Sequence, residues 1–156
     1  MFPIIPANSA SAVGNTEGIF GFGDYSTSYT NLVSNAGVVA TDGSGVGTSR
    51  NFVTACEYGE DKGIFGFGYL TGGVDTGVTN LVSNTGVLQS DTAGVGTARR
   101  ELAACGFGGD KGKSTKGIFL FGKYSGHSYL MTTCNLVSDA GVVASDTSGV
   151  GTARAR

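Results

Sequence analysis

Short stretches in which glycine alternates with bulky apolar residues are the most regular pattern along this chain. GIFGFG occurs at Gly18–Gly23 and again at Gly63–Gly68, and GIFLFG occurs at Gly117–Gly122. Successive side chains of a strand point to opposite faces, so Phe65 and Phe67 are expected to share an aromatic face opposite a face of glycine. Because glycine in a strand is expected where another chain segment approaches closely, each bare face is predicted to receive a neighbour's phenylalanines.

These stretches belong to a longer repeat. TNLVSN at 30–35 returns at 79–84 and as CNLVSD at 134–139, and GVGTSR at 45–50 returns as GVGTAR at 94–99 and 149–154. The spacing between the first motif and the second is the same in all copies, and a period of about 50 residues indicates a repeat architecture. The chain is therefore interpreted as one repeat domain, with an arm at 1–5, unit 1 (Pro6–Arg50), unit 2 (Asn51–Arg99) and unit 3 (Arg100–Arg154).

Each unit is predicted to form four short strands. In unit 2 these are Phe52–Tyr58, Lys62–Leu70, Val78–Asn84 and Val87–Asp91, separated by Gly, Asp, Asn and Thr turn signals. No helical periodicity is present, and the 28 glycines oppose helix. The predicted fold class is all-β, with three four-stranded propeller blades per chain and a ring completed by oligomerisation. Leu120 replaces an inner glycine in unit 3, where a looser or repacked contact is expected.

The amino-acid composition excludes some classes of binding partner. Charged residues make up 14% of the chain, the net charge is −2, and no Lys/Arg cluster is present, so no nucleic-acid partner is expected. The apolar runs are far shorter than the roughly 20 residues that span a bilayer. The beginning of the chain lacks the basic and long apolar regions of a signal peptide. Cys56, Cys105 and Cys134 are odd in number and widely spaced, which argues against a disulfide framework or a metal site.

The unit resembles the kelch-type β-propeller repeat. In unit 3 the resemblance rests on ELAACGFGGD, KGIFLFG, NLVSDAG and GVVASDTSGVGTAR, which match the four strands of that repeat and its closing arginine. The second strand ends in one glycine where the kelch repeat has two, and the kelch tryptophan is absent; RCC1-type propeller repeats are the alternative. The repeats also resemble those of uncharacterised marine phage and metagenomic proteins, which implies a virion-associated or host-surface role without a known activity.

Motifs for catalysis and cofactor binding are weakly supported. GFGGDKGKST at 106–115 has Phe107 where a phosphate-binding loop needs its first glycine, and no helix is predicted after it. The turns DGSG, DTAG and DTSG each offer one carboxylate, which is too few oxygen ligands for calcium. His127 is the single histidine and has no nucleophile motif or carboxylate pair beside it. We therefore expect no enzyme activity, cofactor or metal.

An aspartate precedes the last arginine of every unit at the same spacing. The pairs are Asp42 with Arg50, Asp91 with Arg99, and Asp146 with Arg154. One hypothesis is a ring of charges that binds an anion in a central channel. The favoured interpretation is structural, because the pair recurs in step with the scaffold: one Asp–Arg or Arg–carbonyl contact per unit ties its last strand to a neighbour.

Tyrosines gather between the second and third strands, where the length of the units varies. They lie among Ser, Thr, Gly and Asp, with His127 in the same segment of unit 3: Tyr25, Tyr29, Tyr69, Tyr124 and Tyr129. This composition is typical of adaptable recognition loops, so these residues are candidates for binding a partner or a host glycan. The alternative is that Tyr25, Tyr69 and Tyr124 extend the second strand and pack at the rim.

Three units are fewer than the roughly 4 to 8 blades of a propeller. An open arc would expose aromatic side chains at one end and a bare glycine face at the other. Two copies arranged head to tail would supply six units, so the sequence predicts a homodimer that completes a six-bladed ring, with Ser9–Val13 at the subunit junction. The predicted function is that of a structural or interaction protein of a virion or extracellular surface assembly, with other assembly proteins or host glycans as further partners.

Overall fold

The computed structural model describes residues 17–23, 27–110, 112–125 and 129–155, and these residues form strands and loops without a helix. The strands are β1 (Gly18–Gly21), β2 (Thr30–Val33), β3 (Arg50–Asn51), β4 (Thr54–Tyr58), β5 (Lys62–Leu70), β6 (Asp75–Val82), β7 (Ala103–Phe107), β8 (Lys116–Leu120), β9 (Lys123–Tyr124), β10 (Tyr129–Leu130) and β11 (Cys134–Val137). The prediction of an all-β chain is confirmed. The N-terminal arm and the predicted Ser9–Val13 strand lie outside the described residues.

Unit 2 forms the central sheet. β5 pairs antiparallel with β4 on one side and β6 on the other, and β3 pairs with the last residues of β5. Beyond β6, isolated bridges join Val82 to Leu88 and Thr79 to Thr92. The prediction for β5 is confirmed at both ends, whereas the predicted fourth strand consists only of these bridges.

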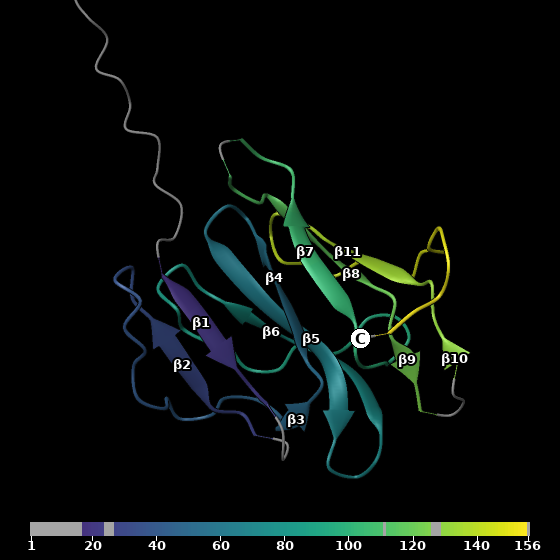
Figure 1. Cartoon of the computed structure of the whole chain (residues 1–156), viewed down its shortest axis with the longest axis horizontal. Coiled ribbons are helices and arrows are strands. Elements are labelled where there is room, and N and C mark those ends of the chain that lie inside the picture. Colours follow the sequence, from purple (N-terminus) through teal and green to yellow (C-terminus); the bar gives the residue numbers. More distant parts are fainter. Residues whose placement is uncertain (1–16, 24–26, 111, 126–128, 156) are drawn as a thin grey trace, which may run out of the picture.

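Units 1 and 3 repeat this pairing beside the central sheet. β1 pairs with β2 in unit 1, and β8 lies between β7 and β11 in unit 3. Isolated bridges attach segment 39–43 to β2 and segment 143–147 to β11, as in unit 2. Figure 1 shows β1 and β2 (purple to blue) on one side of the teal central sheet and β7, β8 and β11 (green to yellow) on the other, with β9 and β10 as a separate hairpin.

A bulge at Phe67 breaks the alternation of β5. Phe67 has a φ of 62°, and the pairing register shifts between Gly66 and Gly68. The prediction that Phe65 and Phe67 share one face is therefore wrong. Phe65 packs in the core cluster that includes partly buried residues of unit 1, whereas Phe67 packs in the cluster that contains Phe119 of unit 3.

Phenylalanine packs on glycine across both unit boundaries, as the sequence pattern predicts. A Cβ added to Gly21 of unit 1 would lie 3.1 Å from the ring of Phe65, and one added to Gly66 would lie 2.8 Å from the ring of Phe119. Edge-to-face ring pairs accompany both contacts, with centroids 5.3 Å apart for Phe22 and Phe65 and 5.2 Å apart for Phe67 and Phe119. The core therefore lies between the units, and its contacts repeat from one boundary to the next.

Candidate functional site

The last arginine of unit 1 inserts into unit 2. Arg50 is completely buried, and its guanidinium donates hydrogen bonds to the carbonyl oxygen of Phe67 (2.9 Å) and to Oδ1 of Asn80 (2.6 Å). A further bond, 3.0 Å long, goes to the carbonyl of Thr48. The guanidinium carbon lies 4.2 Å from the ring centroid of Phe22 in unit 1. Arg50 thus joins two units through its planar set of donors and its stacking face.

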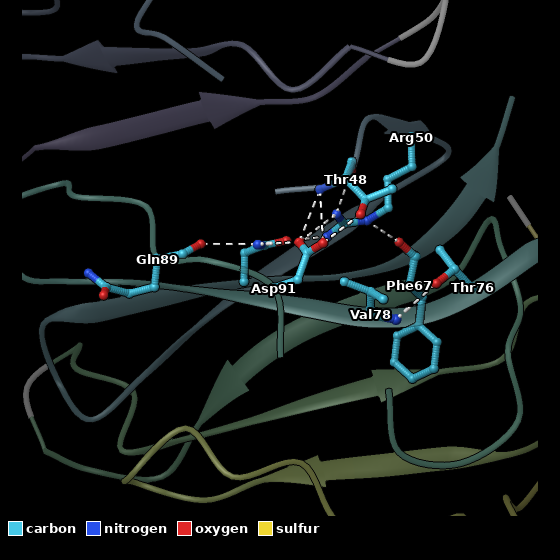
Figure 2. Close-up of polar contacts among 8 residues, drawn as sticks. Thr48, Arg50, Phe67, Thr76, Val78, Gln89 and Asp91 are labelled. Atoms are coloured by element: carbon cyan, nitrogen blue, oxygen red, sulfur yellow. Dashed lines mark hydrogen bonds and ion pairs between the residues drawn. The ribbon is translucent and has the colours of Figure 1, made fainter. Parts of the chain in front are cut away.

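Asp91 of unit 2 holds the segment that carries Arg50. Its carboxylate accepts hydrogen bonds from the Thr48 amide (3.0 and 3.1 Å), the Thr48 hydroxyl (2.5 Å) and Nδ2 of Asn80 (2.9 Å). Arg50 Nη1 lies 4.0 Å from Asp91 Oδ1, an ion pair at longer range. Figure 2 shows Asp91 beside Thr48 and Arg50, with the hydrogen bonds converging on its carboxylate. We call this set of contacts the junction.

The junction between units 2 and 3 has the same contacts. Arg99 donates to the Phe121 carbonyl (2.8 Å), Asn135 Oδ1 (2.7 Å) and the Thr97 carbonyl (3.1 Å). Asp146 accepts from the Thr97 amide (2.9 Å) and hydroxyl (2.6 Å) and from Nδ2 of Asn135 (2.9 Å). Two independent copies of one geometry show that the repeated sequence motifs encode the junction.

Phe67 takes part in both junctions. Its carbonyl accepts from Arg50 of unit 1, while its ring lies 4.3 Å from the guanidinium carbon of Arg99. The left-handed backbone of a residue other than glycine costs about 1 to 3 kcal/mol. Phe22 and Phe121 share it, with φ of 60° and 63°. The strained conformation therefore recurs at the residue that connects one junction with the next.

The second glycine of the GVGT motif allows the two units to approach. A Cβ added to Gly47 would lie 2.3 Å from Asp91 Oδ1, and one added to Gly96 would lie 2.1 Å from Asp146 Oδ1. Both glycines also have φ near +80°, at +82° and +83°. Only glycine suits these positions, because a side chain would meet both a carboxylate and an unfavourable backbone.

The electrostatics of the junction favour ionised partners. Burial lowers the pKa of Arg50 and of Arg99 to about 10, while the nearby aspartate acts in the opposite direction, so both stay charged at neutral pH. Burial works against ionisation of Asp91 and Asp146, but hydrogen bonds from threonine and asparagine hold the pKa of each below its usual value of 3.8. Because Arg50 and Arg99 are completely buried, neither is accessible to an anion in a channel.

The aspartate–arginine pairs predicted from spacing are combined differently in the structure. Arg50 lies by Asp91 and Arg99 by Asp146, so each arginine meets the aspartate of the following unit. Asp42 and Arg154 lie at opposite ends of the array and are both exposed. Every unit carries both an aspartate and an arginine at the same positions, so the repeat alone could not tell whether an arginine meets the aspartate of its own unit or that of the next.

One of the candidate recognition tyrosines is engaged in packing. The guanidinium carbon of Arg100 lies 4.3 Å from the ring centroid of Tyr69, and the Phe52 ring lies 6.4 Å from it. Arg100 also donates a 2.6 Å hydrogen bond to Asp75, whose carboxylate accepts another, also 2.6 Å long, from the Ser125 hydroxyl. This cluster, which sequence reasoning missed, attaches the β5–β6 hairpin to unit 3.

Two other candidate tyrosines are accessible. Tyr29 is 56% exposed and Tyr124 is 43% exposed. Tyr124 pairs with Tyr129 through the backbone of the β9–β10 hairpin. Tyr25 and His127 lie outside the described residues.

Sequence reasoning also missed the buried asparagines. Asn80 and Asn135 are completely buried, and each both accepts from an arginine and donates to an aspartate. Their signal was the recurrence of NLVS at a fixed distance from the arginine. An amide is suited to this position because it offers an acceptor and a donor at once.

The part of the chain that the structure describes assembles no group of three or more His, Cys, Asp or Glu side chains that could hold a metal ion. Burial raises the pKa of Cys56 to about 12, so its thiol is protonated and a poor nucleophile at neutral pH. Over the same residues, no helix is long and apolar enough to cross a membrane. Comparison with protein-family models and with curated proteins gives no match to this chain.

Proposed function

We propose that this chain is a non-enzymatic structural and interaction protein, built from propeller-type units, that serves in a virion or another extracellular surface assembly. The observation that carries the proposal is the repeated junction. Its polar side chains bind one unit to the next, and the two internal arginines at its centre are completely buried. A buried guanidinium whose hydrogen bonds are all taken up by the protein serves assembly and specificity better than it serves chemistry on a substrate.

In this proposal each unit acts as one blade, as in a kelch-type repeat. The support is the antiparallel order of successive strands and the packing of phenylalanine on glycine between adjacent units. A blade that is covered on both faces by its neighbours is the building principle of a propeller. Two copies of the chain would complete a ring of six units.

Fractionation of the source material tests this role. An antibody against the chain should detect it in the rapidly sedimenting fraction, together with the other proteins of a particle or surface layer. Washing at high salt should leave it there, because salt screens buried charges and hydrogen bonds of the junction type much less than it screens exposed charges. Recovery of the chain only as a free, slowly sedimenting protein would contradict the proposal.

A lectin-like role is the second candidate, favoured by the exposure of Tyr29 and Tyr124. Exposed tyrosines supply rigid contact area at low entropic cost. On a glycan array, this candidate predicts saturable binding that is lost in a Tyr29→Ala/Tyr124→Ala variant whose thermal unfolding is unchanged. Normal incorporation into particles without any glycan binding would favour the structural role instead.

A further inference from the structure

The two ends of the unit array carry the two halves of a junction. Inside the array, the donor half is the Gly-Thr-x-Arg segment that ends one unit, and the acceptor half is an asparagine, an aspartate and a phenylalanine carbonyl of the next. Unit 3 carries a donor half and unit 1 an acceptor half that do not meet within the described residues: Gly151, Thr152 and Arg154, and Phe22, Asn31 and Asp42.

The arginine of the donor half of unit 3 already stacks as the internal arginines do. The guanidinium carbon of Arg154 lies 4.2 Å from the ring centroid of Phe121, as Arg99 lies 4.3 Å from that of Phe67. Arg154 is nevertheless exposed. A Cβ added to Gly151, where φ is +104°, would meet nothing within 4 Å, whereas Gly96 is crowded by an aspartate. The glycine that a junction requires is present here without the neighbour that requires it.

The acceptor half of unit 1 is also assembled. Asn31 Nδ2 donates to the Ala40 carbonyl (3.1 Å) and to Asp42 Oδ1 (2.8 Å). Asn80 makes the equivalent bonds in unit 2, at 3.0 and 2.9 Å. Phe22 has the same left-handed backbone as Phe67, with φ of 60°. Unit 1 therefore presents the same three hydrogen-bond acceptors as the internal junctions: Asn31 Oδ1, the Asp42 carboxylate and the Phe22 carbonyl.

An apolar contact shows the same complementarity. Inside the array, a leucine of one unit covers a glycine of the next: a Cβ added to Gly86 would lie 2.5 Å from Leu32, and one added to Gly141 would lie 2.9 Å from Leu81. At the ends, the corresponding Leu136 of unit 3 is 46% exposed. The corresponding glycine of unit 1, Gly37, has nothing within 4 Å.

We propose that a second copy of this chain docks head to tail and completes the junction. Arg154 of one copy donates to the Phe22 carbonyl and to Asn31 Oδ1 of the next. The Thr152 amide and hydroxyl of that first copy donate to Asp42, and its Leu136 covers Gly37. In each of these contacts the donor belongs to the preceding unit and the acceptor to the following one, as in the internal junctions. A single docking geometry is therefore proposed for all of them.

One contact differs from the internal boundaries. The ring of Phe20, which is 69% exposed, corresponds to Phe65 and Phe119, and in the proposed complex it would meet Leu120 where those rings meet glycine. The Phe20 ring must therefore lie to the side of the internal position, which weakens the contact between copies relative to that between units. This predicts that Leu120→Gly tightens self-association.

Self-association of this kind rests on the proposed assembly role in one respect only, namely that the contacts between units also serve binding between molecules. Its test uses the purified 156-residue chain alone, so its failure would leave the particle fractionation standing. Sedimentation velocity over a wide range of concentrations should show self-association of the wild-type chain. Arg154→Met and Asp42→Ala should each weaken association about tenfold or more, because each removes a charged member of the interface centre. Unchanged thermal unfolding at low concentration verifies that both variants fold.

A mixture of the two variants provides the most decisive experiment. The Arg154→Met chain keeps its acceptor end and the Asp42→Ala chain keeps its donor end, so an equimolar mixture can form one intact junction. At a concentration at which each variant alone is monomeric, the mixture is expected to form a heterodimer. A wild-type chain that stays monomeric, variants that associate as the wild type does, or a mixture without heterodimer would each overturn the proposal.

Discussion

At the residue scale, the buried arginines are the most consequential side chains because each satisfies groups from two units. Arg99 is completely buried, and it bonds the Phe121 carbonyl and Asn135 Oδ1 while stacking on Phe67. A lysine could not reproduce this arrangement, because its ammonium lacks the planar fork of donors. The arginines also lie where the strained phenylalanine carbonyls point, so each one offsets part of the backbone strain.

Replacement of Arg99 by methionine is expected to destabilise the fold by about 3 to 5 kcal/mol, because the remaining acceptors stay buried without a donor. Urea denaturation monitored by circular dichroism measures the change. Arg154→Met, measured at a concentration where the chain is monomeric, is the matched control and should cost less than about 1 kcal/mol because Arg154 is exposed. Equal losses in the two variants would contradict the role of the buried guanidinium.

Acid should weaken the junctions. The folded-state pKa values of Asp91 and Asp146 lie below the usual value, so as the pH falls the unfolded chain takes up protons first. The stability that these carboxylates contribute is therefore complete above about pH 5 and is lost as the pH falls through the folded-state pKa. As the pH is lowered, the urea midpoint of an Asp91→Asn/Asp146→Asn variant should fall less steeply than that of the wild type. The variant is expected to be less stable than the wild type at neutral pH. Parallel pH profiles would exclude this linkage.

The residue types of the junction were predictable from the sequence, but their partners were not. The Asp–Arg spacing and the expectation of a structural contact followed from the repeat. Every unit repeats the same aspartate and arginine, so the sequence could not tell whether Arg50 meets Asp42 of its own unit or Asp91 of the next. The asparagine between them gave no separate signal, because it lies in a strand that also contains other polar residues, Asp75, Thr76 and Thr79.

At the scale of the element, the glycines and phenylalanines of β5 have different roles in packing. Gly66 receives the ring of Phe119, and the bulge at Phe67 turns the second aromatic ring toward unit 3. The length of β5 was predictable, since turn residues flank an apolar run. The bulge was not, because strict alternation carries no signal for a left-handed phenylalanine, and only the receiving arginine explains it.

Gly66→Ala should destabilise the chain by about 1 to 3 kcal/mol, the usual cost of overpacking. The added methyl would lie 2.8 Å from the Phe119 ring, which is completely buried and cannot move aside freely. Gly72→Ala is the control, because nothing lies within 4 Å of the added carbon, and it should stay within about 0.5 kcal/mol of the wild type. Thermal unfolding followed by calorimetry measures both, and similar melting temperatures would argue against the glycine face as a receiving surface.

At the scale of the whole molecule, the units form an array whose contacts repeat in one direction. The sequence predicted an all-β chain, its repeat and the packing of phenylalanine on glycine between units. The propeller ring and the homodimer stay predictions, because closure depends on the angle between units, and no local pattern of residues sets that angle. What the structure adds is a specific chemistry for the first and last described units, namely a donor set on unit 3 and an acceptor set on unit 1.

The most direct test of repeated junctions is the nitrogen–proton NMR spectrum of the arginine side chains. At low concentration, the Nε–H groups of Arg50 and Arg99 should give sharp signals protected from exchange, since each belongs to a completely buried arginine and is hydrogen-bonded to a phenylalanine carbonyl. As the concentration rises, the Arg154 Nε–H, identified by its absence in Arg154→Lys, should acquire the same protection and a similar chemical shift. An Arg154 signal that stays unprotected while the chain associates, or rapid exchange at Arg50 and Arg99, would contradict the junction as the unit of assembly.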